Sequence, residues 1–204
     1  VDIRKSRPVS DLHFWTGEIL NVDTPVIAVL GTDCAVGKRT TARFILEACK
    51  TLEIKTELIF TGQTGWMQGY KHGFIFDATP NDFVSGELER VIVECVKNSK
   101  PELILVEGQS SLQNPSGPGG SEFILSGNAT GIILVHPLGR KFFVDLEEFE
   151  YPIPELEDEV KLIESYGTKV IGIGLNEENA SLEELREFQK ITENNLNIPV
   201  ILPL

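Results

Sequence analysis

A glycine-framed loop near the start of the chain carries residue types that bind phosphate. The segment GTDCAVGKRTTA, residues 31–42, follows the apolar run VIAVL and leads into a helical pattern. Such a loop turns backbone N–H groups toward an anion, the helix N-terminus adds partial positive charge, and Lys38 supplies a full charge. The predicted chemistry is binding of a phosphorylated ligand, and the alternative is a glycine-rich turn with an exposed lysine.

The loop departs from the common phosphate-loop pattern in two places. G-x-x-x-x-G-K-[ST] has four residues between its glycines and a hydroxyl after its lysine. Here five residues separate Gly31 from Gly37, and Arg39 follows Lys38. A guanidinium cannot ligate a cation, so the inference of magnesium-dependent phosphoryl transfer is weakened, whereas that of phosphate binding is not. We expect these residues of the segment to contact the ligand: Gly31, Thr32, Asp33, Gly37, Lys38, Arg39, Thr40 and Thr41.

Polar residues that directly follow other apolar runs are further candidates. Glu107 ends the run ELILV, where a carboxylate can act as a base or hold a metal against phosphates. His136 follows the apolar run IILV, and Asp82 begins a helical pattern. Both are further candidates for a catalytic base. Each of the three has a structural alternative: Glu107 could be a polar strand end, His136 a core histidine and Asp82 a helix cap. Further expected ligand contacts are Gly62, Gln63, Gly108, Gln109 and Arg140.

Short apolar runs alternate with helical patterns along the chain. The expected strands are 26–30, 57–60, 103–106, 132–135, 170–173 and 200–202, and helical spacing covers 40–50, 82–96, 156–163 and 182–191. This alternation predicts a doubly wound α/β layer structure with a mostly parallel sheet, with strand 102–107 beside strand 26–30. Because ligands bind at the carboxyl ends of parallel strands, the candidate residues are expected to meet at one edge.

Composition limits the partners that the chain can have. The net charge of −13 disfavours nucleic-acid binding, which needs a basic face. The longest apolar runs are about strand length, so we expect no membrane span. The three cysteines show no metal-ligand spacing, and their odd number favours a reducing cytoplasm. Trp66 and Met67 would pack in the core or at an oligomer interface, and we expect a homo-oligomer that acts on small molecules.

Five motifs in one order resemble a known protein family. They are GTDCAVGKRTTA, TGQTG at 61–65, DFVSGELE at 82–89, LVEGQSSL at 105–112 and HPLGR at 136–140. Together they resemble the P-loop family that includes bacterial D-glutamate N-acetyltransferase. The resemblance implies a P-loop NTPase-like three-layer fold over residues 25–204. It also implies that residues 1–24 are a segment or linker and that the family's N-terminal Rossmann-like domain is absent from this chain.

The resemblance also implies an activity, with alternatives. The implied reaction is N-acetylation of an acidic amino acid such as D-glutamate, with acetyl-CoA as the donor. The loop itself is also similar to that of dethiobiotin synthetase, G-T-D-x-x-V-G-K-T, which implies an ATP- and magnesium-dependent enzyme that activates a carboxylate. A noncatalytic nucleotide-sensing domain is the third possibility. Among Glu107, His136 and Asp82, the residue that acts as the base stays open.

Overall fold

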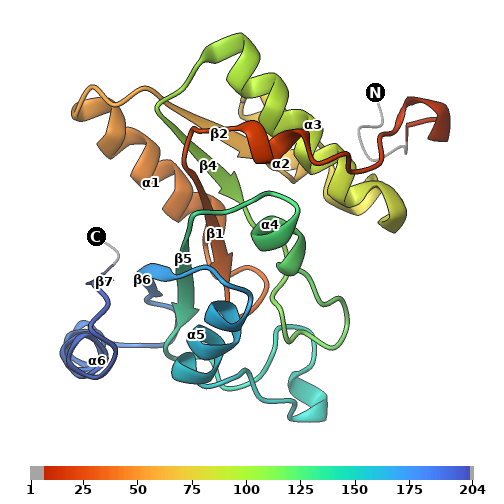
Figure 1. The fold of residues 1–204 in the computed structure, drawn as a ribbon. Coiled ribbons are helices and arrows are strands. Elements are labelled where there is room, and N and C mark those ends of the chain that lie inside the picture. Colours follow the sequence, from red (N-terminus) through yellow and green to blue (C-terminus); the bar gives the residue numbers. More distant parts are fainter. Residues whose placement is uncertain (1–6, 203–204) are drawn as a thin grey trace.

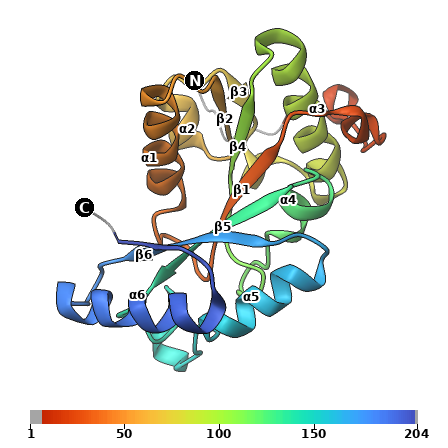
Figure 2. The same ribbon diagram turned by 60° about the vertical axis from the view of Figure 1, so that its left-hand side comes forward.

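The protein is built on one sheet of seven parallel strands, with helices packed on both of its faces (Figures 1 and 2). The computed structural model describes residues 7–202. The strand order across the sheet is β3-β2-β4-β1-β5-β6-β7. The strands are β1 Val26–Gly31, β2 Thr56–Phe60, β3 His72–Gly73, β4 Leu103–Glu107, β5 Gly131–Pro137, β6 Val170–Asn176 and β7 Val200–Ile201. The predicted P-loop NTPase-like α/β fold is confirmed, as is the predicted pairing of β4 with β1.

The helices form the outer layers of the structure. They are α1 Lys38–Thr51, α2 Gln63–Met67, α3 Asn81–Ser99, α4 Ser121–Leu125, α5 Leu156–Ser165 and α6 Leu182–Leu196. The predicted helical segments lie within α1, α3, α5 and α6, with ends that differ by a few residues. Helix α6 begins at a capping box, in which Ser181 accepts a hydrogen bond from the Glu184 backbone N–H.

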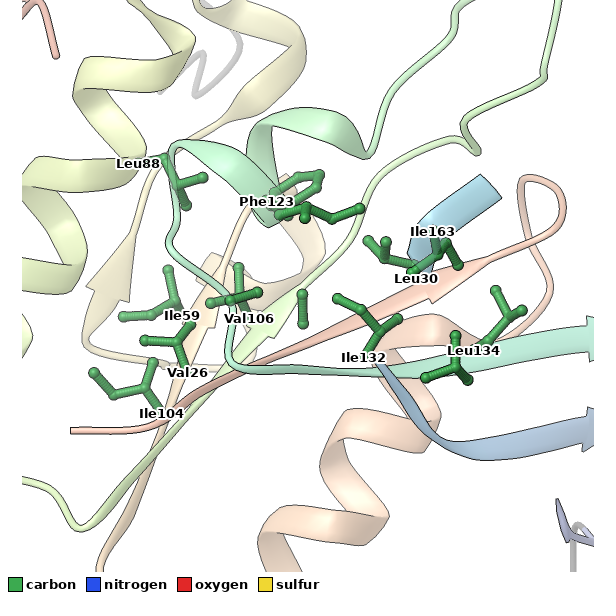
Figure 3. Packing of buried hydrophobic residues seen from close by; sticks show 14 of the residues in the cluster. Val26, Leu30, Ile59, Leu88, Ile104, Val106, Phe123, Ile132, Leu134 and Ile163 are labelled. Atoms are coloured by element: carbon green, nitrogen blue, oxygen red, sulfur yellow. The ribbon is translucent and has the colours of Figure 1, made fainter. Parts of the chain in front are cut away.

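The central strands are mostly apolar because both faces of the sheet are covered. On one face, Val29, Leu105 and Val135 pack with Ala42 of α1. On the other face, the strands pack against Leu88 of α3, as well as Phe123 of α4 and Ile163 of α5; Figure 3 shows these side chains over the sheet. Removal of this surface from water supplies about 25 cal/mol per Å² and is the main favourable contribution to folding.

A segment that precedes the sheet, residues 7–22, lies along α3 (Figure 1), and we call it the N-terminal strap. Two buried carboxylates of α3 hold it. Glu87 accepts hydrogen bonds from the His13 backbone N–H and the Arg7 guanidinium, and Glu89 accepts them from the backbone N–H groups of Thr16 and Ile19.

Burial of the two carboxylates would by itself raise their pKa values. Hydrogen bonds from Arg90 and His13 outweigh this effect at Glu87, and those from the strap do so at Glu89, so both pKa values lie below the ordinary one. Glu87 and Glu89 are therefore charged anchors for the strap at neutral pH.

Within residues 7–202, no helix is both long and apolar enough to cross a membrane.

Candidate functional site

Four neighbouring strands end at the same edge of the sheet and bring the predicted segments together. Strands β4, β1, β5 and β6 are adjacent, and the residues that follow them form one surface. Val29 pairs with Glu107, and Gly31 pairs with Val135. The phosphate loop after β1 therefore lies between the loop that follows β4 and the loop that follows β5.

The loop of residues 31–38 depends on its two glycines. A Cβ atom on Gly31 would lie 2.6 Å from a Val36 methyl group, so a larger residue would collide with the loop itself. Gly37 has a φ of +97°, which favours glycine, and α1 begins at the next residue. The chain thus wraps tightly and then enters a helix, as phosphate binding at a helix N-terminus requires.

Lys38 extends into the loop and is only 8% exposed, which excludes the alternative of an exposed lysine. Its ammonium group donates to the carbonyl of Asp33 at 2.8 Å and to the carbonyl of Ser110 at 2.7 Å. Burial lowers the pKa of Lys38 to about 8, although nearby Cys34, Asp33 and Glu107 oppose that shift. A bound anion would favour the charged form, so binding of an anion would raise this pKa again.

Asp33 and Arg140 brace the loop from its outer side. The Asp33 carboxylate is fully buried and accepts from the Arg140 guanidinium and the Val144 backbone N–H, both at 2.8 Å. Arg140 also donates to the Cys34 carbonyl and to Glu178. These contacts hold the loop in shape, and neither side chain lines the cavity described next. Direct ligand contact by Asp33 and Arg140 stays a prediction.

A polar cavity of about 400 Å³ lies between the phosphate loop and the end of β4. Its walls are residues 34–40 and 107–110. The predicted residues that meet there are Gly37, Lys38, Arg39, Thr40, Glu107, Gly108 and Gln109. The cavity therefore combines the loop backbone and two cationic side chains, a lining that could hold an anion, with the carboxylate of Glu107.

Glu107 is the carboxylate of this cavity. It is 3% exposed, and its Oε1 atom lies 3.4 Å from the Arg39 guanidinium. Its other oxygen accepts a 3.4 Å hydrogen bond from the Thr61 backbone N–H. Loss of solvent raises the pKa of Glu107, and Arg39 and the Thr61 N–H counteract this effect only in part. A desolvated carboxylate with few partners is a stronger base than one in water.

The segment TGQTG, residues 61–65, lies against Glu107 as well. Gln109 donates to the Thr61 hydroxyl at 2.9 Å, and that hydroxyl donates to the Glu107 carbonyl. A Cβ atom on Gly65 would lie 2.4 Å from the Phe60 Cβ atom and 3.2 Å from the Glu107 carboxylate, so only glycine fits between them. Gly62 lies close to Gln109 and Glu107, and Gln63 follows it as the first residue of α2, but neither residue lines the cavity.

His136 and Asp82 lie outside the cavity. The Nδ1 atom of His136 lies 3.0 Å from the Thr32 hydroxyl, and its ring stacks on Phe188 of α6. Burial lowers the pKa of His136 to about 4, so the ring is neutral at pH 7. Asp82 is exposed in the first turn of α3. The structure thus brings Glu107 to Lys38 but does not bring the other two candidate bases there.

Some contacts around the loop were not among the sequence candidates. The Ser110 carbonyl receives Lys38, and Asn176 donates to the Val36 carbonyl at 2.9 Å from the end of β6. A backbone carbonyl has no sequence signal. The position of Asn176 at the end of an apolar strand was a usable signal, since the residues of that edge form the site.

A second, mostly apolar cavity of about 510 Å³ adjoins the first. It lies between α1 and the ends of β5, β6 and β7, and both cavities are lined by Val36, Gly37 and Thr40. Phe44 and Ile45 of α1 contribute to its walls. The two cavities therefore lie on either side of the start of α1 and could hold parts of one elongated ligand.

The described part of the chain has no group of three or more His, Cys, Asp or Glu side chains placed to hold a metal ion.

The parallel sheet and the lysine loop at a helix N-terminus define a P-loop α/β protein. More narrowly, the chain belongs to the family described as domain of unknown function, DUF1611_C, P-loop domain, which matches residues 13–204. The predicted family is thereby confirmed.

Two relatives have the name D-glutamate N-acetyltransferase. The protein from Pseudoalteromonas sp is 27% identical over 196 residues, which are 94% of this chain and 58% of the relative. The protein from Tritonibacter scottomollicae is 29% identical over 179 residues, which are 85% of this chain and 53% of the relative. The chain thus spans little more than half the length of these proteins.

Solved structures agree with this placement. A crystal structure of a DUF1611 family protein from Anabaena variabilis has a TM-score of 0.86 and 27% identity. The match covers 98% of this chain and 58% of that protein. The cell division protein MinD from Aquifex aeolicus has a TM-score of 0.54 and 13% identity over 87% of this chain and 80% of its own, which shows a shared fold alone.

Proposed function

We propose that this chain binds acetyl-CoA through its phosphate loop and takes part in transfer of the acetyl group to an acidic amino acid such as D-glutamate. The observation that carries the proposal is the buried Lys38 in a polar cavity that adjoins an apolar one. The names of the two relatives support the choice of reaction. Because the chain covers only part of those proteins, the complete activity is itself part of the proposal.

The cavities suit the chemistry of coenzyme A. Its diphosphate needs N–H donors and positive charge, which the loop, the start of α1 and Lys38 provide. Its adenine and its pantetheine arm are less polar and need room beside the diphosphate. The second cavity, with Phe44 and Ile45 in its walls, offers that room next to the loop.

Acetyl transfer needs a base at the amino group of the acceptor. The acceptor loses one ammonium proton, and its nitrogen then forms a bond to the thioester carbonyl carbon. The C–S bond breaks, the nitrogen releases a second proton, and the departing thiolate takes up one proton, which yields an N-acetylated amino acid and free CoA. Glu107 is the proposed acceptor of the first proton, because it is the desolvated carboxylate of the cavity that Lys38 lines.

Calorimetry combined with a thiol-release assay tests the proposal. Acetyl-CoA, CoA, ADP and ATP are each titrated, and CoA release is followed in the presence of D-glutamate. We expect CoA to bind and its thiol to appear only with the amino acid. Lys38→Ala should weaken CoA binding by about 10- to 100-fold, since a charge-assisted hydrogen bond contributes about 1.5–3 kcal/mol. Lys50→Ala, at the exposed far end of α1, should bind like the wild type. Magnesium-dependent release of ADP from ATP, without CoA turnover, would contradict the proposal.

Glu107→Gln tests the role of the base separately from binding. Loss of a general base typically costs 10²- to 10⁴-fold in rate, so we expect turnover to fall by about 100-fold or more. CoA affinity should be retained, because the variant keeps the loop and Lys38. Turnover close to that of the wild type would exclude Glu107 as the base.

A further inference from the structure

The position that directly follows Lys38 decides whether a P-loop site can hold a metal ion. In P-loop enzymes a hydroxyl at this position and a carboxylate at the end of a neighbouring strand hold magnesium against the phosphates. Here the position is Arg39, and the neighbouring carboxylate is Glu107. Their side chains face each other in the cavity, with Nη1 and Oε1 at 3.4 Å.

We infer that the Arg39 guanidinium takes the place of the divalent cation, so that this site binds the diphosphate of its ligand without a metal ion. The inference rests on the phosphate-binding part of the proposed function and is independent of acetyl transfer. Arg39 is then a specificity-determining residue: it makes the site select phosphorylated ligands that carry no bound metal ion.

The residues around Arg39 do not fit magnesium. Thr40 is the next hydroxyl on α1, but one residue of helix rotates it by about 100° from the position after the lysine. Thr40 is an exposed residue where the two cavities meet, and Thr41 lines only the second cavity. Glu107 would be a single protein ligand, and its Oε1 atom already faces a cation. A magnesium ion at this point would meet a positive guanidinium at short range, which is repulsive.

The same residues do fit a phosphate group. Arg39 and Lys38 are the two cationic side chains that line the polar cavity, and Glu107 is its one carboxylate. The guanidinium has five N–H donors in a planar fork that matches phosphate oxygens, and a contact of 3.4 Å to Glu107 leaves most of them free. The Arg39 side chain is one-third exposed, so a ligand can reach it. Glu107 then holds the fork toward the cavity and partly neutralises it.

Calorimetry with ADP as the probe tests this inference, with magnesium or with EDTA. For the wild type we expect the two dissociation constants to agree within about twofold. Arg39→Thr restores the usual hydroxyl after the lysine, so ADP binding in EDTA should weaken by about 10- to 100-fold and should recover in part with magnesium. Arg43→Thr removes an exposed arginine one turn further along α1 and should match the wild type under both conditions.

Glu107→Gln distinguishes the two roles of the carboxylate. If Glu107 partly neutralises Arg39, the variant should bind ADP in EDTA as tightly as the wild type or more tightly. If Glu107 holds a metal ion, wild-type binding should disappear in EDTA and the variant should lose its response to magnesium; either result would overturn the inference. Metal-free binding without acetyl transfer would contradict only the proposed function, and acetyl transfer with metal-dependent binding would contradict only the inference.

Discussion

Burial gives Lys38 a pKa of about 8, so its charge depends on pH in the range where enzymes are assayed. Below pH 8 the free protein carries the ammonium form, which a phosphate ligand needs. Above pH 8 the free form is neutral, and binding must take up a proton. The affinity for an anion is therefore full at lower pH and decreases as pH rises through 8, until the higher pKa of the complex is reached.

We expect ADP to bind about tenfold more weakly at pH 9 than at pH 7.5, since about one-tenth of Lys38 is charged at the higher pH. Calorimetry at the two pH values measures the change. In Lys38→Arg the charge does not titrate, so affinity should vary little over this range. A flat wild-type profile would mean that Lys38 stays charged in the free protein.

Individual site residues were predictable where their role depends on a local pattern. Gly31, Gly37 and Lys38 have fixed spacing and a fixed place between strand and helix, and they lie as expected. The side-chain environments of His136 and Arg140 depend on residues far along the chain, such as Thr32, Phe188 and Asp33. The sequence placed these two at the correct edge of the sheet but could not indicate that they contact the loop rather than the cavity.

Helix α3 and the N-terminal strap form a unit that the sequence pattern only partly indicates. The apolar spacing of α3 was recognised, and Asp82 at its start was a candidate base. Asp82 is exposed, whereas Glu89, a buried acid of the same helix, accepts hydrogen bonds from the strap. The pairing joins residues 70 or more positions apart, and no local signal identifies such partners. Strand β3 was missed because its two residues are too few for an alternating pattern.

Gly86 provides a direct test of how closely the strap packs on α3. A Cβ atom at this position would lie 2.0 Å from the His13 carbonyl oxygen and 2.5 Å from the Phe14 carbonyl carbon. Backbone atoms cannot move aside as a flexible side chain can. We therefore expect Gly86→Ala to lower the free energy of unfolding by about 2 kcal/mol or more, or to release the strap.

Thermal unfolding and limited proteolysis measure the two outcomes. A loss of about 2 kcal/mol lowers the melting temperature by about 4–8 °C in a protein of this size. Release of the strap would appear as faster cleavage within residues 7–22. Gly117→Ala is the matched control, because a Cβ atom there meets open space, and its melting temperature should change little. Unchanged stability and cleavage in Gly86→Ala would show that the strap packs less closely than described.

The candidate site lies at one edge of the sheet. The centre of that sheet is the part of the molecule that is best shielded from solvent. Strands β4, β1 and β5 each have a strand on both sides and helices on both faces, whereas β3 and β7 are two-residue strands at the outer edges. This overall plan was the most predictable part, because alternation of apolar runs with helical spacing has few stable solutions. The phosphate loop therefore extends from the central strand of the sheet.

Hydrogen exchange should reveal this gradient and the place where a ligand binds. Amides of β1, β4 and β5 are expected to exchange only when the whole domain unfolds, and those of β3 and β7 should exchange much faster by local opening. Addition of ADP should slow exchange in residues 31–41 and 107–110, because the ligand covers the loop and the end of β4. Peptide-level mass spectrometry resolves these segments. Slowing confined to other segments, such as α3 with the strap, would place the anion site elsewhere and would contradict the role given to Lys38.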